Sequence, residues 1–212
     1  MRIASALAPL WAFLCLAAGC ASHGAAVGDS PIPPDWRSVA TDHDKGRLRE
    51  WRTAWMRGLA KAQASGHGAA VAAEGALLDP DAAIAWQDPA PGAYRCRTIK
   101  IGAQADGLLD YIAYPPFDCR LRKEKGLLRL AKLSGSQRPI GMLLPYAPNR
   151  MLFLGTLQLG DETRPFEYGR DRERDLAAVV ERIGERRWRL AFPFPHFESV
   201  IDVIELTPVP GR

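Results

Sequence analysis

The chain has 212 residues, of which 47% are hydrophobic and 25% are charged. This length suits one domain of ordinary size, alone or with a small appendage, and the composition excludes wholesale disorder, collagen and coiled coils. Lysine and arginine together number 28 and aspartate and glutamate 24, an excess too small to indicate binding to nucleic acid.

The first twenty residues have the pattern of a bacterial export signal. Arg2 gives a positively charged start, and the apolar stretch 3–18 that follows is too short to span a membrane. Small residues precede Cys20, as in the lipobox of bacterial lipoproteins. We therefore predict a signal peptide over 1–19 and a lipid on Cys20 that anchors the protein to a membrane. An ordinary secretory signal without a lipid is the alternative.

Export places the protein on the periplasmic side of the cell envelope. In a Gram-negative cell, Ala21 directly after the lipidated cysteine favours the outer membrane. The folded region then keeps two cysteines, Cys96 and Cys119, which we expect to form a disulfide in an oxidising compartment. In the chain-entropy description such a bond contributes ~3 kcal/mol. No C-x-x-C motif is present, and we predict no metal and no cofactor.

Composition and periodicity divide the rest of the chain into four segments. They are a disordered tether over 20–34, a helical hairpin over 35–78, a linker over 79–93 and an antiparallel β domain over 94–209.

Two helices are expected in the hairpin. The first runs from about 42 to 64, capped by Thr41 and carrying one apolar stripe that includes Trp51 and Trp55. The second covers 69–77.

Short strands separated by turns are expected throughout the β domain. Their ranges are 94–101, 111–122, 127–133, 138–146, 150–159, 174–183, 187–193 and 199–207. About eight antiparallel strands with short connections form either a barrel or a sandwich. The predicted fold class is therefore α+β, a helical hairpin joined to a barrel-like domain. Gly155, inside the fifth strand, suits a bend or a close approach of two backbones.

The segment 174–183 fits two structures. Its apolar residues recur at a helical period, and Gly184 would end such a helix. The β-branched cluster before Gly184 and the Trp188-Arg189-Leu190 run after it also fit the two arms of a β-hairpin, which we favour.

The familiar catalytic motifs are absent from the sequence, so candidate sites rest on unusual local clusters. His196 and Glu198 could form a general base oriented by a carboxylate. The Asp42-His43-Asp44 run could bind a metal, but acidic residues are favoured in a first helical turn in any case. The turn from Leu133 to Pro139 is a weak candidate for a ligand-binding turn.

The most unusual segment alternates arginine with carboxylates and forms a candidate recognition loop. A solvated loop neutralised by its own weak ion pairs is the plain alternative. Its candidate binding residues are Asp161, Glu162, Tyr168, Arg170, Asp171, Arg172, Glu173 and Arg174.

Several runs, taken together, resemble a family of bacterial exported proteins catalogued only as a domain of unknown function. The resemblance covers about residues 34–207 and implies an exported context, but no activity and no catalytic residues. The runs that carry it are 135–139, 153–157, 160–162, 168–175, 180–184 and 197–199.

We therefore predict a non-enzymatic envelope protein that binds a small ligand or a protein partner. One alternative is an interaction or inhibitor module that acts through the arginine- and aspartate-rich loop. The other is a hydrolase that uses His196 and Glu198.

Overall fold

The computed structural model of the protein describes residue 1 and residues 32–210. Apart from residue 1, the predicted signal peptide over 1–19 lies outside the described residues, as do the lipid on Cys20 and most of the predicted tether.

Helical segments occupy the N-terminal part of the described chain. They are α1 (Trp36–Val39), α2 (Asp42–Arg49), α3 (Trp51–Ala62), the wide turn η1 (Gln63–His67), α4 (Gly68–Ala73) and the short 3₁₀ turn η2 (Gly75–Leu77). The predicted helical hairpin is present, with η1 as its bend, because Gly66 adopts a left-handed φ of 88° there.

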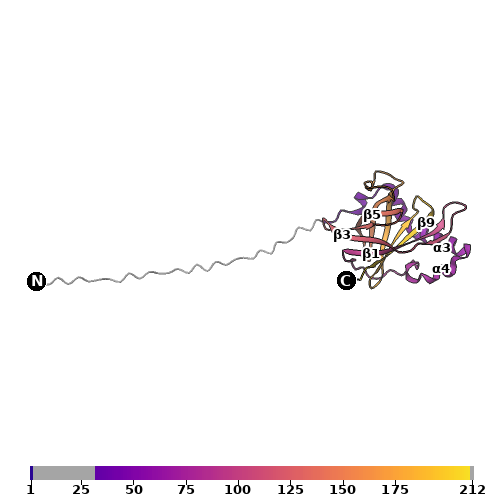
Figure 1. Cartoon of the computed structure of the whole chain (residues 1–212), viewed down its shortest axis with the longest axis horizontal. Coiled ribbons are helices and arrows are strands. Elements are labelled where there is room, and N and C mark those ends of the chain that lie inside the picture. Colours follow the sequence, from indigo (N-terminus) through magenta and orange to yellow (C-terminus); the bar gives the residue numbers. More distant parts are fainter. Residues whose placement is uncertain (2–31, 211–212) are drawn as a thin grey trace.

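Nine antiparallel strands follow. They are β1 (Gly92–Ala103), β2 (Tyr111–Ala113), β3 (Phe117–Glu124), β4 (Leu127–Lys132), β5 (Gln137–Ala147), β6 (Arg150–Leu159), β7 (Asp175–Gly184), β8 (Arg187–Pro193) and β9 (Ser199–Pro208). Strands β1 and β3–β9 form a ring in that order, and the β1–β9 pairing closes it. Four strands of this ring, β1, β3, β5 and β9, are labelled in Figure 1. The predicted α+β class is confirmed, and the β domain is a closed eight-stranded barrel with one additional short strand, β2.

The first strand of the barrel joins three neighbours. One edge of β1 pairs with β9 over nine residue pairs. The other edge is divided between β3, with five pairs, and β2, with three. The Cys96–Cys119 disulfide, with its Cα atoms 5.8 Å apart, joins β1 to β3. It therefore reinforces the shorter of the two pairings that β1 makes within the ring. The predicted disulfide is confirmed.

Alternate residues of each strand face the barrel interior, which is filled at one end. Tyr94, Leu121, Leu130, Phe153 and Trp188 belong to one buried cluster there. The opposite end, where β1 ends and β9 begins, is where the interior becomes polar, and we call it the barrel mouth.

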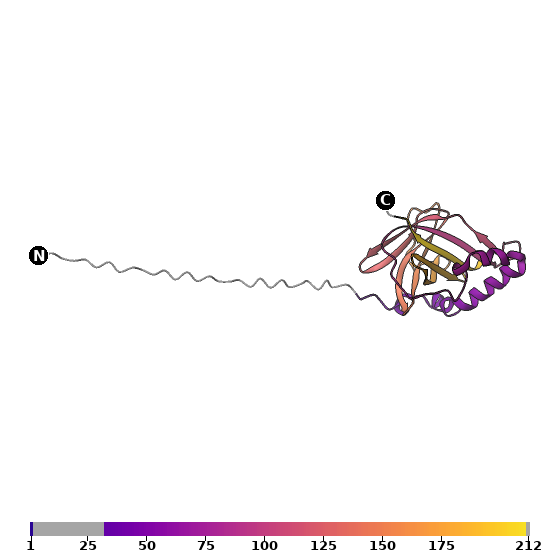
Figure 2. The same ribbon diagram turned by 90° about the horizontal axis from the view of Figure 1, so that it is seen from below.

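The helices cover the outside of one side of the barrel (Figure 2). Trp55 and Leu59 of α3 pack with Ile99, Ile101 and Val203, which point outward from β1 and β9. The preceding helix, α2, packs on β7 through a separate buried cluster. The chain wraps around the barrel and bends between these two contacts.

Three sequence predictions need correction. The helix expected over 42–64 is broken at Glu50, because α2 and α3 lie on different strands of a curved surface. Gly75, with a φ of 54°, divides the helix expected over 69–77. The strand expected over 111–122 is two strands, because Pro115 and Pro116 have no N–H groups to continue the ladder.

Two further predictions are confirmed. β7 and β8 pair as an antiparallel hairpin, which decides the ambiguous segment 174–183 in favour of strand. Gly155 lies directly opposite Gly141 on β5, where a Cβ at Gly155 would lie 2.6 Å from the Gly141 Cα. The backbones therefore approach as closely as the sequence suggested.

Candidate functional site

A cavity of about 140 Å³ opens at the barrel mouth. Its floor is apolar and consists of Leu157, Leu176, Phe192 and Ile204, which point inward from β6, β7, β8 and β9. Its rim is polar and comes from strand ends and from the loops after β4, β6 and β8. The polar lining residues are Thr98, Lys100, Tyr114, Lys132, Ser136, Gln137, Glu173, His196, Glu198 and Asp202.

Lys100 is the centre of the ion pairs in this cavity. Its Nζ lies 2.9 Å from Glu198 Oε2 and 3.3 Å from Asp202 Oδ2, and it donates to Gln137 Oε1 at 3.1 Å. Burial lowers the pKa of Lys100, but the two carboxylates outweigh it and leave that pKa raised. Burial raises the pKa of Asp202, although Lys100 and the Ser199 hydroxyl both favour its ionised form.

The backbone of the β8–β9 loop is held in an unusual conformation beside these charges. Phe194 and Glu198 adopt left-handed φ angles of 45° and 72°, which non-glycine residues rarely do. This conformation directs the Glu198 carboxylate toward Lys100. Backbone of this kind persists only where surrounding contacts enforce it, and it is concentrated at functional sites.

Lys132 is the last residue of β4, and its side chain faces the cavity. It differs from Lys100 in its partners. The residue is only 6% exposed. Its Nζ donates to the Gln137 carbonyl at 2.8 Å and lies 3.8 Å from the centre of the Phe117 ring. Within the described part of the chain, no carboxylate oxygen lies within 4 Å of this nitrogen. Burial, together with the positive charge of Lys100, lowers the pKa of Lys132 to about 8.

His196 forms one wall of the cavity and connects it to helix α2. Its ring stacks on that of His43, with the ring centres 5.4 Å apart. Burial lowers the pKa of both imidazoles, and the charges of Arg47 and Arg172 lower it further. His196 Nε2 is buried and has no hydrogen-bond partner among the described residues.

A buried polar group, here called the mouth clamp, joins α2 to two mouth loops. It consists of Asp44, Arg47 and Tyr168. The Asp44 carboxylate accepts from Arg47 Nε at 3.0 Å and from the Tyr168 hydroxyl at 2.6 Å. Arg47 also donates to the carbonyls of Asp175 and Phe194, at 2.8 and 3.3 Å. The helix thereby fixes the loops on both sides of the cavity.

The structure unites candidates that the sequence presented separately. His43, Tyr168, Glu173, His196 and Glu198 all lie at the barrel mouth. Glu198 contacts Lys100, however, and within the described residues no hydrogen bond joins it to His196. The carboxylate of Asp44 is engaged by the mouth clamp, and the exposed carboxylate of Asp42 accepts from Lys45 Nζ at 3.1 Å.

Of the other candidate residues in the loop, some contact one another and the rest are exposed to solvent. Glu162 and Arg174 form an ion pair of 3.1 Å at the base of the loop, and Asp171 accepts from the Glu173 amide. The candidate residues of the loop that remain exposed are Asp161, Arg170, Arg172 and Glu173, the last of them at the rim of the cavity.

The chain matches one known protein family over most of its length. The sequence profile of the family described as Domain of unknown function (DUF4893) matches residues 36–206. The chain belongs to this family. That agrees with the family resemblance noted from the sequence. No curated protein and no solved structure shows significant similarity to the chain.

The sequence predictions missed the most polar part of the cavity in this DUF4893 domain. Lys100, Lys132 and Asp202 come from β1, β4 and β9, which are distant in sequence. A signal for Lys132 was available, because it follows Leu128 and Leu130 at alternate positions and therefore faces inward. A charged residue at an inward position of a barrel strand is the pattern to look for.

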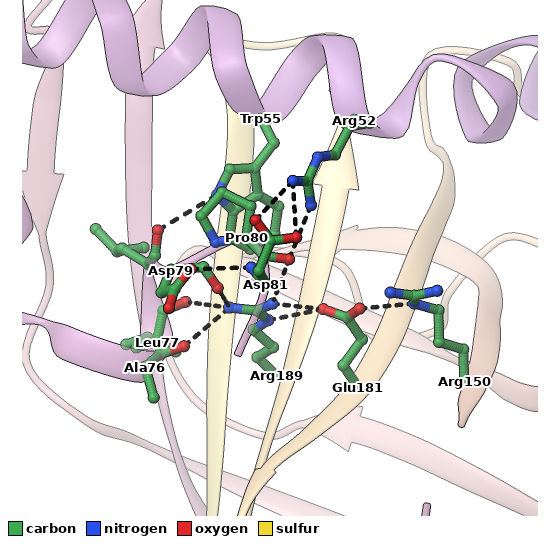
Figure 3. Close-up of polar contacts among 11 residues, drawn as sticks. Arg52, Trp55, Ala76, Leu77, Asp79, Pro80, Asp81, Arg150, Glu181 and Arg189 are labelled. Carbon is green, nitrogen blue, oxygen red and sulfur yellow. Dashed lines mark hydrogen bonds and ion pairs between the residues drawn. The ribbon is translucent and has the colours of Figure 1, made fainter. Parts of the chain in front are cut away.

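A second buried ion network lies outside the barrel, beneath α3 (Figure 3). Arg189 on β8 and Glu181 on β7 are both 0% exposed, and Arg189 Nη2 lies 2.7 Å from Glu181 Oε2. Arg150 contacts the other oxygen of Glu181 at 2.7 Å. Arg189 also donates to the carbonyls of Ala76 and Leu77, so this network holds the end of the helical hairpin on the barrel.

Metal sites and membrane spans are both absent from the described residues. No group of three or more His, Cys, Asp or Glu side chains there is arranged to hold a metal ion. None of the described helices has the length and apolar character needed to cross a membrane.

Proposed function

We propose that the protein binds one small organic molecule in the barrel-mouth cavity and does so in the cell envelope, without catalysing a reaction. The observation that carries this proposal is the contrast between the two ends of the barrel. One end is filled by packed apolar side chains, whereas the mouth keeps a cavity with an apolar floor and a polar rim. Ligand sites commonly combine these two kinds of lining.

The cavity volume limits the size of the ligand. A cavity of about 140 Å³ is close to the volume of about 150 Å³ in which an engineered protein cavity binds benzene. We therefore expect ligands of about six to ten non-hydrogen atoms.

The charges of the lining argue for a ligand without net charge. The cavity is lined by two lysines, Lys100 and Lys132, and by three carboxylates, those of Glu173, Glu198 and Asp202. Most of its formal charge is therefore matched within the lining, and no large excess of one sign calls for a ligand ion of the opposite sign. A neutral molecule with one hydrogen-bonding group would use both the floor and the rim.

The envelope location is supported mainly by the sequence. Residues 1–20 carry the positive start, the apolar stretch and the small residues before Cys20 that are typical of exported lipoproteins. The disulfide in the barrel agrees with an oxidising compartment.

Native mass spectrometry of the purified full chain tests the proposal. A bound molecule adds a mass that disappears on denaturation. Leu157→Trp should abolish that mass, because the indole would fill the floor of the cavity. Leu133→Trp is the matched control, since Leu133 is exposed and does not line the cavity.

Circular dichroism in the near ultraviolet would show that both variants remain folded. Should the wild type have the bare polypeptide mass and bind no member of a panel of neutral fragments in this size range, the cavity would not be a ligand site.

A further inference from the structure

We propose that Lys132 is a carbonyl-reactive amine that captures a small aldehyde or ketone in the barrel-mouth cavity as a Schiff base. This inference rests on the proposed ligand-binding function and names its ligand class. It treats Lys132 as a reactive group and not as a structural ion-pair partner.

The contacts around Lys132 hold its amine at the wall of the cavity. Its Nζ is fixed by the Gln137 carbonyl at 2.8 Å and by the face of the Phe117 ring. Gly135, with a φ of 88°, gives this nitrogen room, because a Cβ there would lie 3.2 Å from it. The amine is therefore positioned before any ligand enters.

The absence of a carboxylate beside Lys132 is the decisive contrast with Lys100. A buried lysine normally has an anionic partner, and Lys100 has two within 3.3 Å. Lys132 has none within 4 Å among the described residues. It faces the positive charges of Lys100 and Arg138, which the more distant carboxylate of Asp202 offsets only in part. A lysine that is desolvated beside another cation is the arrangement that activates an amine as a nucleophile.

The protonation state of Lys132 supports this role. Burial and Lys100 lower its pKa to about 8, so about a tenth of the amine is neutral at pH 7. An ordinary lysine with a pKa near 10.4 is neutral to less than about a thousandth at that pH. The neutral form is the one that attacks a carbonyl carbon.

The reaction balances without an oxidant or a reductant. The lone pair of neutral Nζ forms a bond to the carbonyl carbon as the C=O π bond breaks. One proton then passes from nitrogen to the oxygen, giving a neutral carbinolamine. Nitrogen loses a proton, and the hydroxyl gains one and leaves as water while the C=N double bond forms. The net change is aldehyde plus amine to imine plus water.

Groups that move these protons line the same cavity. Glu198 is half-exposed at the rim, and Asp202 has a pKa raised by burial. His196 presents a buried Nε2 without a partner among the described residues. A carboxylic acid or an imidazole placed here can protonate the departing hydroxyl, and the carboxylates can stabilise the protonated imine.

Benzaldehyde is a suitable probe, because its eight non-hydrogen atoms fall in the expected size range. The full chain would be incubated at pH 7 with benzaldehyde and sodium cyanoborohydride, which reduces an imine to a stable benzylamine. Peptide mapping by mass spectrometry then gives the extent of modification at each of the six lysines.

We expect Lys132 to be modified at least about tenfold faster than the exposed Lys123 and Lys125. Its rate should reach half its maximum near pH 8, whereas the exposed lysines should continue to gain reactivity to higher pH. In urea the preference should vanish, because it depends on the folded cavity. This comparison within one chain needs no variant.

Lys132→Arg keeps the charge and should remove the fast adduct, whereas Lys123→Arg should leave it unchanged. Equal rates at Lys132 and the exposed lysines of the folded chain would overturn the inference. The proposed binding function is separable from it. Saturable non-covalent binding of benzyl alcohol, which cannot form an imine, would support the cavity as a ligand site even then.

Discussion

Arg189 illustrates how one buried side chain can organise parts of the molecule that are remote in sequence. Its guanidinium donates to Glu181 on the neighbouring strand and to the carbonyls of Ala76, Leu77 and Asp79 at the end of the helical hairpin (Figure 3). Its charge also lies 4.5 Å from the centre of the Trp55 ring. Burial lowers the pKa of Arg189, and these acceptors offset that cost.

Removing one partner of the Arg189–Glu181 pair should strongly reduce the stability of the fold. Arg189→Met leaves Glu181 buried with only Arg150 beside it, and we expect a loss of about 3–5 kcal/mol in the free energy of unfolding. The double variant Arg189→Met/Glu181→Leu should recover part of the loss, because no buried carboxylate remains. It should stay below wild type, since the hairpin carbonyls still lack their donor.

Urea unfolding measures these differences. The matched control is Arg129→Met, because Arg129 pairs with Glu124 on the surface at 3.3 Å, and an exposed pair contributes less than about 1 kcal/mol. If Arg189→Met cost no more than Arg129→Met, the buried network would not be holding the hairpin to the barrel.

At the scale of elements, the seating of α3 on the barrel depends on two glycines that meet face to face. A Cβ at Gly58 would lie 2.7 Å from Ile201 Cγ2 and 3.2 Å from the Ile101 carbonyl oxygen. Gly102, with a φ of 72°, lies opposite, where its Cβ would be 3.0 Å from the Gly58 Cα. The helix therefore lies against the β1 backbone itself.

Gly58→Ala should push α3 away from the barrel and reduce stability by about 1–3 kcal/mol, as overpacking does. Gly68→Ala is the control, because Gly68 begins α4 and a Cβ there would meet no heavy atom within 4 Å. It should be neutral or slightly stabilising through helix propensity. Thermal denaturation of the two variants compares them, and equal melting temperatures would contradict the close seating of α3.

The elements differ in how far the sequence predicts them. The strand 150–159 and the 187–193 arm of the hairpin agree with their observed bounds, because alternation and turn residues are local signals. The breaks at Glu50 and Gly75 are missed, because they depend on the curved surface beneath the helices. The sequence does not decide between a barrel and a sandwich, because closure of the barrel requires the long-range pairing of β1 with β9.

The candidate site is the least predictable feature for the same reason. His196 and Glu198 stand out in the sequence because they are close together in the chain. Lys100 and Lys132 do not, because they meet only after strands distant in sequence have paired. Long-range assembly, and not local composition, creates the cavity.

On the scale of the whole molecule, the barrel mouth is where the helical layer and the barrel meet. Arg47 of α2 holds the Asp175 and Phe194 carbonyls, and His43 stacks on His196. We call these contacts between α2 and the mouth loops the joint at the barrel mouth. A change in the joint therefore acts on the loops beside the cavity as well as on the helix. Protonation of His43 and His196 is the change in the joint that a fall in pH produces most readily.

Both imidazoles face Arg47 and Arg172, while Asp44 and Glu173 are the carboxylates that oppose these charges. Burial, with the arginines, holds the pKa of each histidine below the ordinary 6.5. The unfolded chain therefore binds protons first as pH falls. Stability from the pair is complete above pH 6.5 and is lost as pH falls from there through the folded-state pKa values.

Each histidine contributes up to about 1.4 kcal/mol per pH unit within that window. The double variant His43→Gln/His196→Gln should lack this pH-dependent loss of stability. As pH falls from about 7 to about 5, the melting temperature of wild type should therefore fall more than that of the variant, so that the two values converge or cross. Above about pH 7 the two curves should run parallel, which corrects for any constant cost of the substitutions. Curves that stay parallel below pH 6.5 would show that protonation of the stacked pair does not loosen the joint at the barrel mouth.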